Sequence, residues 1–564
     1  MTDTTRNNPD IDHTNGPIFS PAHAPEWPAG VVIGFGTALA MWLAWLFTHA
    51  PAVLTGSGQT ASSPVTTAAV AAAMLVAVIV GARKASGPGW LVGLIAGGVS
   101  GLVNLMLLGS ILSEQVETAD QMHEAANQFR DNAPMIVGGF FAVSLAAGAV
   151  AGAVGGMLRP AGQTQRPGEW VSRMAVLTVV AMLPLISIGG AVTSTESGMA
   201  VPGGVSSYGA VSVLFPLSLM AEPRIFLEHT HRLFGMLVGL HAIVLAVLAM
   251  TSGRRGTLIG VIGAVALIGV AVGAVAAERA GGLGVTGSVI LTGLASVAGL
   301  GFTHAMNSRG RLAAACAGLL ALVTIQGLLG IQRVDEDLIG VAMFHGLFAQ
   351  IVIVTAVMIA ASLSPTFSTA EGGVTPETKV LGARLFKFGL IALVLLTFQL
   401  VLGAASRHLG GAKGGAHVTL THAANSFVVV VVVIIVAALC TKGDTQTPVG
   451  RTLKRIGGAL MVVLTIQFLL GWAALGMVGI GREPRPIPLA GELAVAHAIP
   501  IGEAIVTTSH QVGGAVLYAL VALAATWGRR AKRATEAELV EPNAASDEET
   551  AGGDADIGGG FADM

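Results

Sequence analysis

The feature that most constrains this chain is a series of long apolar runs, each about the length of a membrane-spanning helix. A helix rises about 1.5 Å per residue and the hydrocarbon core of a bilayer is about 30 Å thick, so a spanning helix needs about 20 apolar residues. We find fourteen such runs, near residues 29–48, 65–82, 90–112, 134–157, 173–193, 230–251, 256–277, 284–304, 312–331, 338–362, 385–406, 418–440, 454–477 and 503–527. They predict an all-α membrane protein with about 14 transmembrane helices.

Composition supports this class, because 53% of the residues are hydrophobic and only 11% are charged. A net charge of −2 gives no reason to expect nucleic acid as a partner. The two cysteines, Cys316 and Cys440, both lie inside apolar runs, so no disulfide framework is indicated.

Lys and Arg residues gather in alternate connections between the runs, which predicts the orientation of the chain. Cytoplasmic loops carry the excess of basic residues, so both termini are expected on the cytoplasmic side of the cell (inner) membrane. Residues 1–28 are polar and proline-containing and predict a disordered cytoplasmic arm. Residues 535–564 are acidic and lack Lys and Arg, which predicts a disordered tail.

Short internal echoes indicate a duplicated unit. "TIQGLLG" at Thr324–Gly330 returns as "TIQFLLG" at Thr465–Gly471, and "LISIGGAVTS" at Leu185–Ser194 is echoed by "LVLGAASRH" at Leu400–His408. Each copy holds an even number of spans starting inside, so we predict two parallel four-helix repeats. They occupy residues 173–362 and 385–527.

The first repeat is longer than the second, which predicts a helical-hairpin insertion at 256–304. Four extra N-terminal helices, at 29–157, lie outside both repeats. Within them Gly148, Gly152 and Gly156 are the small residues that close helix packing needs, so a structural or partner-docking role is expected for this region.

Four histidines take matching places in the two repeats. His231 and His345 lie near the outer ends of two helices of the first repeat, and His422 and His510 lie at equivalent places in the second. Facing imidazoles in an apolar helical bundle are typical axial ligands of haem iron. A lone histidine at such a place is also explained as an interfacial or carbonyl-bonded side chain, but four matched histidines favour ligation.

Glu228 precedes His231 by three residues, which places both side chains on one helical face. The matching position of the second repeat is Thr419, so only one repeat carries the carboxylate. This asymmetry indicates one reactive site and one auxiliary site. A helix-capping role for Glu228 is the alternative, and a di-iron centre would need further glutamates that the spans lack.

The other histidines are assigned simpler roles. His417 lies about 140° around the helix from His422, so only one of the two can face a given iron, and the "HAA" context favours His422. His241 is expected to bond a carbonyl or a neighbouring helix. Interfacial positions are expected for His229, His304, His408 and His497.

These residues resemble the haem A synthases. The resemblance rests on "GGAVTSTESGMAVP" at Gly189–Pro202, "EHTHRLFG" at Glu228–Gly235, "QGLLG" and "FHGLF" in the first half, and "LGAASRH", "THAA" and "TTSHQVGGA" in the second. It implies that Glu228 is catalytic, that His231 and His345 bind the substrate haem O, and that His422 and His510 bind haem b. The implied reaction converts the C8 methyl of haem O to a formyl group.

The resemblance also implies haem O synthase and the assembly of terminal oxidases as partners, beside membrane lipid, and it is compatible with a homo-oligomer. Two other hypotheses remain at this point. A dihaem b-type membrane cytochrome would keep the four histidines but have no need of Glu228. A transporter would account for many spans and parallel repeats, but it predicts charged or unwound sites at the membrane midplane, whereas the ionisable residues here gather at helix ends.

Overall fold

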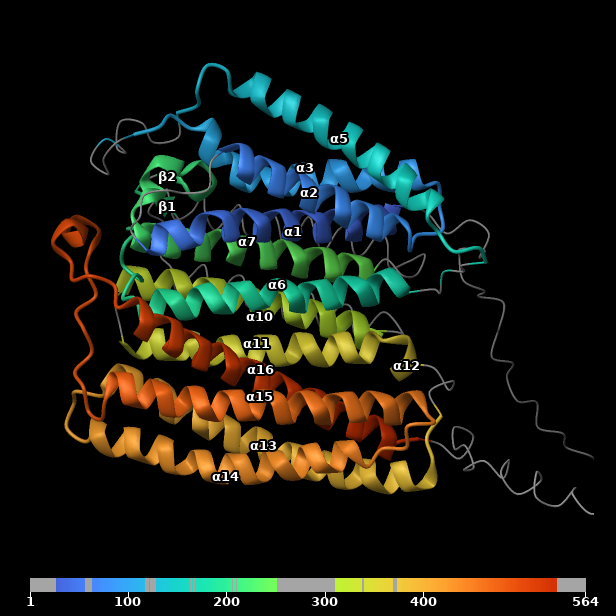
Figure 1. The fold of residues 1–564 in the computed structure, drawn as a ribbon, viewed down its shortest axis with the longest axis vertical. Coiled ribbons are helices and arrows are strands. Elements are labelled where there is room, and N and C mark those ends of the chain that lie inside the picture. Colours follow the sequence, from blue (N-terminus) through green and yellow to red (C-terminus); the bar gives the residue numbers. More distant parts are fainter. Residues whose placement is uncertain are drawn as a thin grey trace, which may run out of the picture.

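The computed structural model consists almost entirely of long helices that run side by side (Figure 1). It describes residues 27–55, 63–116, 121, 128–162, 165, 168–204, 206–208, 210–250, 310–336, 339–368 and 373–534. Within these residues, twelve helices are long and apolar enough to cross a membrane, and each matches one predicted run. The predicted all-α multi-pass architecture is therefore confirmed. The predicted arm as far as residue 26, the hairpin 256–304 and the tail 535–564 lie outside the described residues.

The N-terminal region contributes four helices, namely α1 (Trp27–Leu54), α2 (Ser63–Ala82), α3 (Gly89–Leu112) and α5 (Ala133–Met157). Glycines form the contact between α3 and α5. A Cβ atom added at Gly93 would lie 2.1 Å from the main-chain oxygen of Gly148, and one added at Gly152 would lie 2.3 Å from that of Gly89. Carbon atoms pack at about 3.5 to 4.0 Å, so only glycine allows this approach. The predicted close packing at Gly148 and Gly152 is confirmed.

The remaining spans form two four-helix rings. The first ring contains α6 (Glu169–Ser194), α7 (Pro223–Met250), α10 (Gly310–Glu336) and α11 (Ile339–Leu363); the second contains α13 (Pro376–Leu409), α14 (Gly415–Thr441), α15 (Pro448–Val478) and α16 (Ile501–Lys532). In each ring every helix packs on the next in chain order, and the last packs back on the first. This shared order of neighbours is the arrangement that a duplicated unit requires.

The N-terminal helix α1 packs directly against the first ring. Trp42 is fully buried, donates from Nε1 to Oδ1 of Asn104 at 2.9 Å, and meets the ring of Phe234 edge-on at 5.3 Å. Phe35 lies two turns before Trp42 on the same face of α1, and its ring meets that of His241 edge-on at 4.9 Å. The N-terminal region and the first ring therefore share one hydrophobic core.

Helix α16 is the main connection between the two rings. It packs on α13 and α15 of its own ring and also on α6 and α11 of the first ring. The hydroxyl of Thr507 donates to that of Ser194 at 2.9 Å, and the amide oxygen of Gln511 lies 3.2 Å from the Cβ position of Gly190. Its start and its middle are thus fixed against α6.

Short elements connect the helix ends. At one end lie a two-stranded antiparallel ribbon, β1 (Ser206–Ser207) with β2 (Ala210–Val211), and the 3-10 turns η3 (Ser212–Leu214), η4 (Leu217–Ala221) and η6 (Ala490–Val495). We call this the outer end, because the opposite end holds the basic loops and the short helix α12 (Pro365–Ser368) (Figure 1). At the basic end, Thr375 and Thr447 cap α13 and α15 by accepting main-chain N–H bonds at 3.2 and 3.1 Å.

Candidate functional site

The structure brings the four predicted ligand histidines together as two facing pairs. His231 of α7 and His345 of α11 have ring centroids 6.5 Å apart and ring planes at 84°. His422 of α14 and His510 of α16 have centroids 6.2 Å apart and planes at 90°. In each ring the pair joins the second helix to the fourth.

The spacing in each pair fits two ligands on opposite sides of one iron. With a metal–nitrogen bond of about 2 Å and an imidazole radius of about 1.1 Å, two such centroids lie about 6.2 Å apart. Each ring can turn about its own metal–nitrogen axis, so perpendicular planes are compatible with this geometry. Among the residues that the structure describes, no group of three or more His, Cys, Asp or Glu could hold a metal. An iron held by two imidazoles takes its other donors from a macrocycle, and the residues present therefore fit haem.

A glycine on the preceding helix supports each of the four histidines. A Cβ atom added at the glycine would lie 2.9 to 3.1 Å from the imidazole, which ordinary packing does not allow. The pairs are Gly189 with His231, Gly330 with His345, Gly403 with His422, and Gly471 with His510. Three of these glycines follow a glutamine by four residues, at Gln326, Gln399 and Gln467. This Gln-x-x-x-Gly spacing was the sequence signal for the supporting residues, and the sequence interpretation missed it.

The imidazole of one of the four histidines, His231, is oriented differently from the others. In three pairs the glycine faces Cε1 of the imidazole, but Gly189 faces Nε2 of His231. The imidazole of His231 is therefore turned differently against its glycine from the other three.

His422 of the second pair has the hydrogen bonds that metal-binding histidines commonly show. Nδ1 of His422 lies 3.1 Å from the main-chain oxygen of Gln399, whose own side chain donates to the main-chain oxygen of His422 at 2.9 Å. Asn425 donates to the amide oxygen of Gln399 at 2.8 Å and holds it in place. Metal-binding histidines commonly donate their second N–H to a carbonyl. With Nδ1 as that donor, Nε2 of His422 keeps its lone pair for a metal.

Glu228 lies in α7, one turn before His231, and is buried. Its Oε1 accepts a bond from Nε of Arg232 at 3.2 Å, whereas Oε2 has no partner among the described residues. Leaving a buried carboxylate oxygen unpaired is costly, and such an atom marks a place that a ligand or water completes. The capping role is filled by Glu222, which accepts the main-chain N–H of Ile225 at 2.7 Å.

Arg232 connects the carboxylate of Glu228 to the outer loop. Its Nη1 donates to the main-chain oxygen of Gly203 at 2.6 Å, and its Nη2 donates to that of Val201 at 2.8 Å. Val201 belongs to the "TESGMAVP" stretch, and Gly203 directly follows it. The position of Glu228 therefore depends on how this loop folds.

Glu196 in the same loop is the centre of an ion-pair network that sequence reasoning did not find. Its Oε1 accepts from Arg407 at 2.8 Å and lies 3.3 Å from Nε of Arg485, while Oε2 lies 3.5 Å from His497. Glu503 binds the other side of Arg485 at 2.6 Å. Hydrogen bonding to Glu503 and the charges of both glutamates hold the pKa of Arg485 above its ordinary value. The network ties the first ring to the second at the outer end.

The predicted interfacial position of His229 is wrong. The side chain is fully buried, and its ring lies 4.4 Å from that of Phe215 with the planes 31° apart. Phe215 belongs to the outer loop, which folds back over the start of α7. Sequence periodicity locates a residue on a helix but cannot show that a distant loop will cover it.

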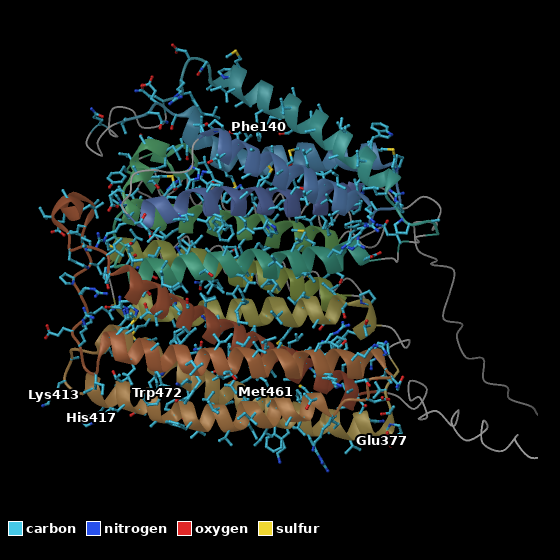
Figure 2. The ribbon with its side chains drawn as sticks, in the orientation of Figure 1. Phe140, Glu377, Lys413, His417, Met461 and Trp472 are labelled. Carbon is cyan, nitrogen blue, oxygen red and sulfur yellow. The ribbon has the colours of Figure 1, made fainter. Side chains whose placement is uncertain are left out.

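The remaining histidines behave largely as predicted. His241 is buried, and its Nδ1 lies 2.8 Å from the main-chain oxygen of Leu237, so the predicted carbonyl bond is confirmed. His417 is exposed at the outer end of α14 near Lys413 (Figure 2). His408 and His497 are partly exposed near helix ends, as expected, and His304 lies outside the described residues.

The chain was also compared with models of protein families, with curated proteins and with solved structures. None of them matches. The case for a function therefore rests on the residues and on the geometry described above.

Proposed function

We propose that this protein is a haem A synthase. It holds haem b between His422 and His510 and oxidises the C8 methyl of haem O, bound between His231 and His345, to a formyl group. The observation that carries the proposal is the pair of facing imidazoles in each ring, 6.2 and 6.5 Å apart, with an incompletely bonded carboxylate beside only one of them.

The difference between the two rings supports separate roles. Where the first ring has Glu228, the second has Thr419, whose hydroxyl donates to the main-chain oxygen of Gly415 at 3.1 Å. Thr419 adds no charge, and His422 of the second pair has a main-chain carbonyl partner at Nδ1. These features suit an electron carrier in the second ring and a reacting group in the first.

When bound, haem supplies redox-active iron for electron transfer and oxidation. The conversion of a methyl to a formyl group is a four-electron oxidation at one carbon, R–CH3 + H2O → R–CHO + 4 H+ + 4 e−, in which water supplies the oxygen and an external acceptor such as dioxygen takes the electrons. Positive charge develops at that carbon as electrons leave. The carboxylate of Glu228 stabilises that charge or accepts a proton, and Arg232 holds the carboxylate in place. Burial strengthens this electrostatic effect because the surroundings exclude water.

Cations at the outer end of the first ring complement the carboxylate groups of a haem. Arg333, in the last turn of α10, packs on the backbone of Gly198 and lies within electrostatic range of both His231 and His345. A guanidinium at this place pairs well with carboxylates. The other, apolar side chains of the first four-helix ring suit the porphyrin.

A dihaem cytochrome is the second candidate, and one observation favours it. Glu228 already forms an ion pair with Arg232, four residues further along α7. That pair would give the carboxylate a purely structural purpose. Chemical analysis of the haems separates the two candidates.

The decisive experiment is co-expression of the full chain with a haem O synthase, followed by extraction and chromatography of the haems. We expect haem A from the unmodified protein and a strong reduction with Glu228→Gln, which keeps size while removing charge. Glu222→Gln is the matched control, because it removes another carboxylate near the start of the same helix. Wild-type haem A yield from Glu228→Gln would exclude Glu228 from the mechanism, and no haem A from the unmodified protein would favour the cytochrome.

The haem b site is tested by absorption spectroscopy of purified protein. His510→Ala should remove the low-spin b-type signal, whereas His417→Ala should retain it because the His417 side chain is exposed and lies about 140° around α14 from His422. Equal loss in both variants would contradict the ligand assignment.

The proposal includes a location and partners. The basic end faces the cytoplasm by the distribution of Lys and Arg, which puts both haem sites near the outer face of the inner membrane. Haem O synthase would supply the substrate, and the assembly of terminal oxidases would consume the product.

A further inference from the structure

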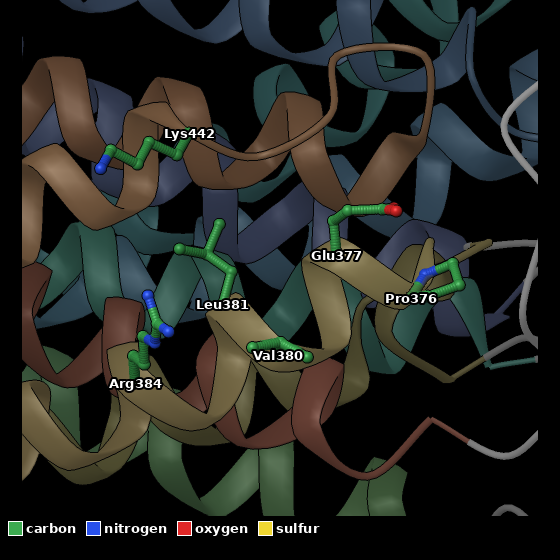
Figure 3. Close-up of a pocket in the computed structure, with 6 residues that line it drawn as sticks. All are labelled: Pro376, Glu377, Val380, Leu381, Arg384 and Lys442. Atoms are coloured by element: carbon green, nitrogen blue, oxygen red, sulfur yellow. The ribbon is translucent and has the colours of Figure 1, made fainter.

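The second ring carries an open pocket at its basic end, far from the histidine pairs. Its volume is about 440 Å³, and it lies between the start of α13 and the end of α14 (Figure 3). The lining residues are Pro376, Glu377, Val380, Leu381, Arg384 and Lys442. None of them belongs to the proposed haem sites.

Two cations flank one apolar side chain in this pocket. Arg384 and Lys442 are both exposed and project on either side of Leu381 (Figure 3). Within the part of the chain that the structure describes, neither forms an ion pair. Glu377 also lines the pocket, and its carboxylate points away from the ammonium of Lys442 (Figure 3).

Apolar surface continues from the pocket toward the middle of the bundle. Val380 is 58% exposed, and further along α13 Leu390 and Val394 are 45% and 70% exposed. On the neighbouring helix α14, Val431 is 57% exposed. The cations near the ends of α13 and α14 thus lie next to an exposed apolar surface that faces the lipid.

We propose that this pocket binds the phosphate headgroup of an anionic phospholipid. Arg384 and Lys442 pair with the phosphate, and the exposed side chains of α13 and α14 contact the acyl chains. Basic pockets between spanning helices at the cytoplasmic side are suited to such headgroups. The charge and the adjoining apolar wall together favour a lipid over a soluble anion. This site is independent of the proposed haem chemistry.

Native mass spectrometry of the detergent-solubilised full chain tests the proposal. The probes are dioleoylphosphatidylglycerol and, as the zwitterionic comparison, dioleoylphosphatidylcholine. Each basic side chain near an anionic headgroup contributes about fivefold in affinity, so the double variant Arg384→Gln/Lys442→Gln should bind phosphatidylglycerol about 25-fold more weakly.

The matched control is Lys454→Gln/Arg455→Gln. It removes the same charge from exposed positions of α15 at the basic end, and neither residue lines the pocket. This control should retain binding. A charge-keeping variant, Arg384→Lys/Lys442→Arg, should also retain most of it, which separates loss of charge from loss of folding.

Three results would overturn the proposal. Equal weakening in both Gln double variants would show diffuse attraction rather than a site. Equal binding of the two lipids would remove the role of headgroup charge. Displacement of phosphatidylglycerol by millimolar inorganic phosphate would identify a site for soluble anions instead.

Discussion

Gly471 lies on α15 directly behind the proposed ligand His510, and replacing it with alanine should disturb only that histidine. The added Cβ would lie 2.9 Å from Cε1 of His510. Carbon atoms pack at about 3.5 to 4.0 Å, so the ring must move by about 0.6 Å or more. Metal–ligand distances tolerate only about 0.2 Å, so a ring displaced this far no longer binds iron well.

The size of the effect follows from the cost of overpacking. One extra carbon in a filled site typically costs about 1 to 3 kcal/mol, which corresponds to about a 5- to 150-fold loss of affinity when the strain falls on the bound state. Gly476→Ala is the matched control, because the same substitution on the same helix meets no atom within 4 Å. We therefore expect weaker haem b binding for Gly471→Ala and none of this loss for Gly476→Ala.

Haem titration of the purified apoprotein, followed by the reduced-minus-oxidised difference spectrum, gives the two affinities. Thermal unfolding of both variants checks that the helices remain assembled. Unchanged affinity in Gly471→Ala would refute the reasoning, because it would mean that His510 does not rest against Gly471 while it holds haem. Equal losses in the two alanine variants would point to a general effect on α15.

Three further predictions concern stability, each read from the midpoint of thermal unfolding in detergent. Trp42→Ala should destabilise the protein by about 3 to 5 kcal/mol because a fully buried indole is lost. Trp90→Ala is the control and should change the stability much less, because Trp90 is 54% exposed. Equal shifts in the two variants would contradict the shared core. Burial raises the pKa of the Glu222 carboxyl, so its charged form is disfavoured in the folded state. The free energy of unfolding should therefore fall as the pH rises from the ordinary pKa of 4.5 to the raised value. Glu222→Gln should remove this pH dependence while the amide oxygen keeps the cap, and an unchanged pH profile would contradict it. Arg407→Gln should lower the free energy of unfolding by about 1 to 3 kcal/mol, because Glu196 loses one of two guanidinium partners. In a double-mutant cycle, most of this loss should disappear when Glu196→Gln is already present.

The helices and the histidine pairs could be predicted because both follow from local spacing. Apolar runs of about 20 residues define spans whatever the tertiary structure. The matched positions of His345 and His510 follow from the repeat, and helical geometry alone separates His417 from His422.

Features that depend on distant segments could not be read in the same way. Glu196 was visible within "TESGM", but its partners Arg407 and Arg485 lie more than 200 residues further along the chain. The outer loop that buries His229 has no regular pattern. The contact of α1 with α7 depends on which face of α1 meets α7, and the nearly uniform hydrophobicity of α1 carries no such information.

Helix α16 carries His510 and is also fixed against α6, whose Gly189 supports His231. A shift of α16 when His510 takes a ligand must therefore reach the first imidazole pair through one helix. Thermodynamic linkage makes such coupling reciprocal, so a group bound in either ring changes the affinity of the other by the same factor. We expect the two imidazole pairs to fill cooperatively rather than independently, so that, under the proposed function, haem b bound in the second ring would change the affinity of the first ring for haem O.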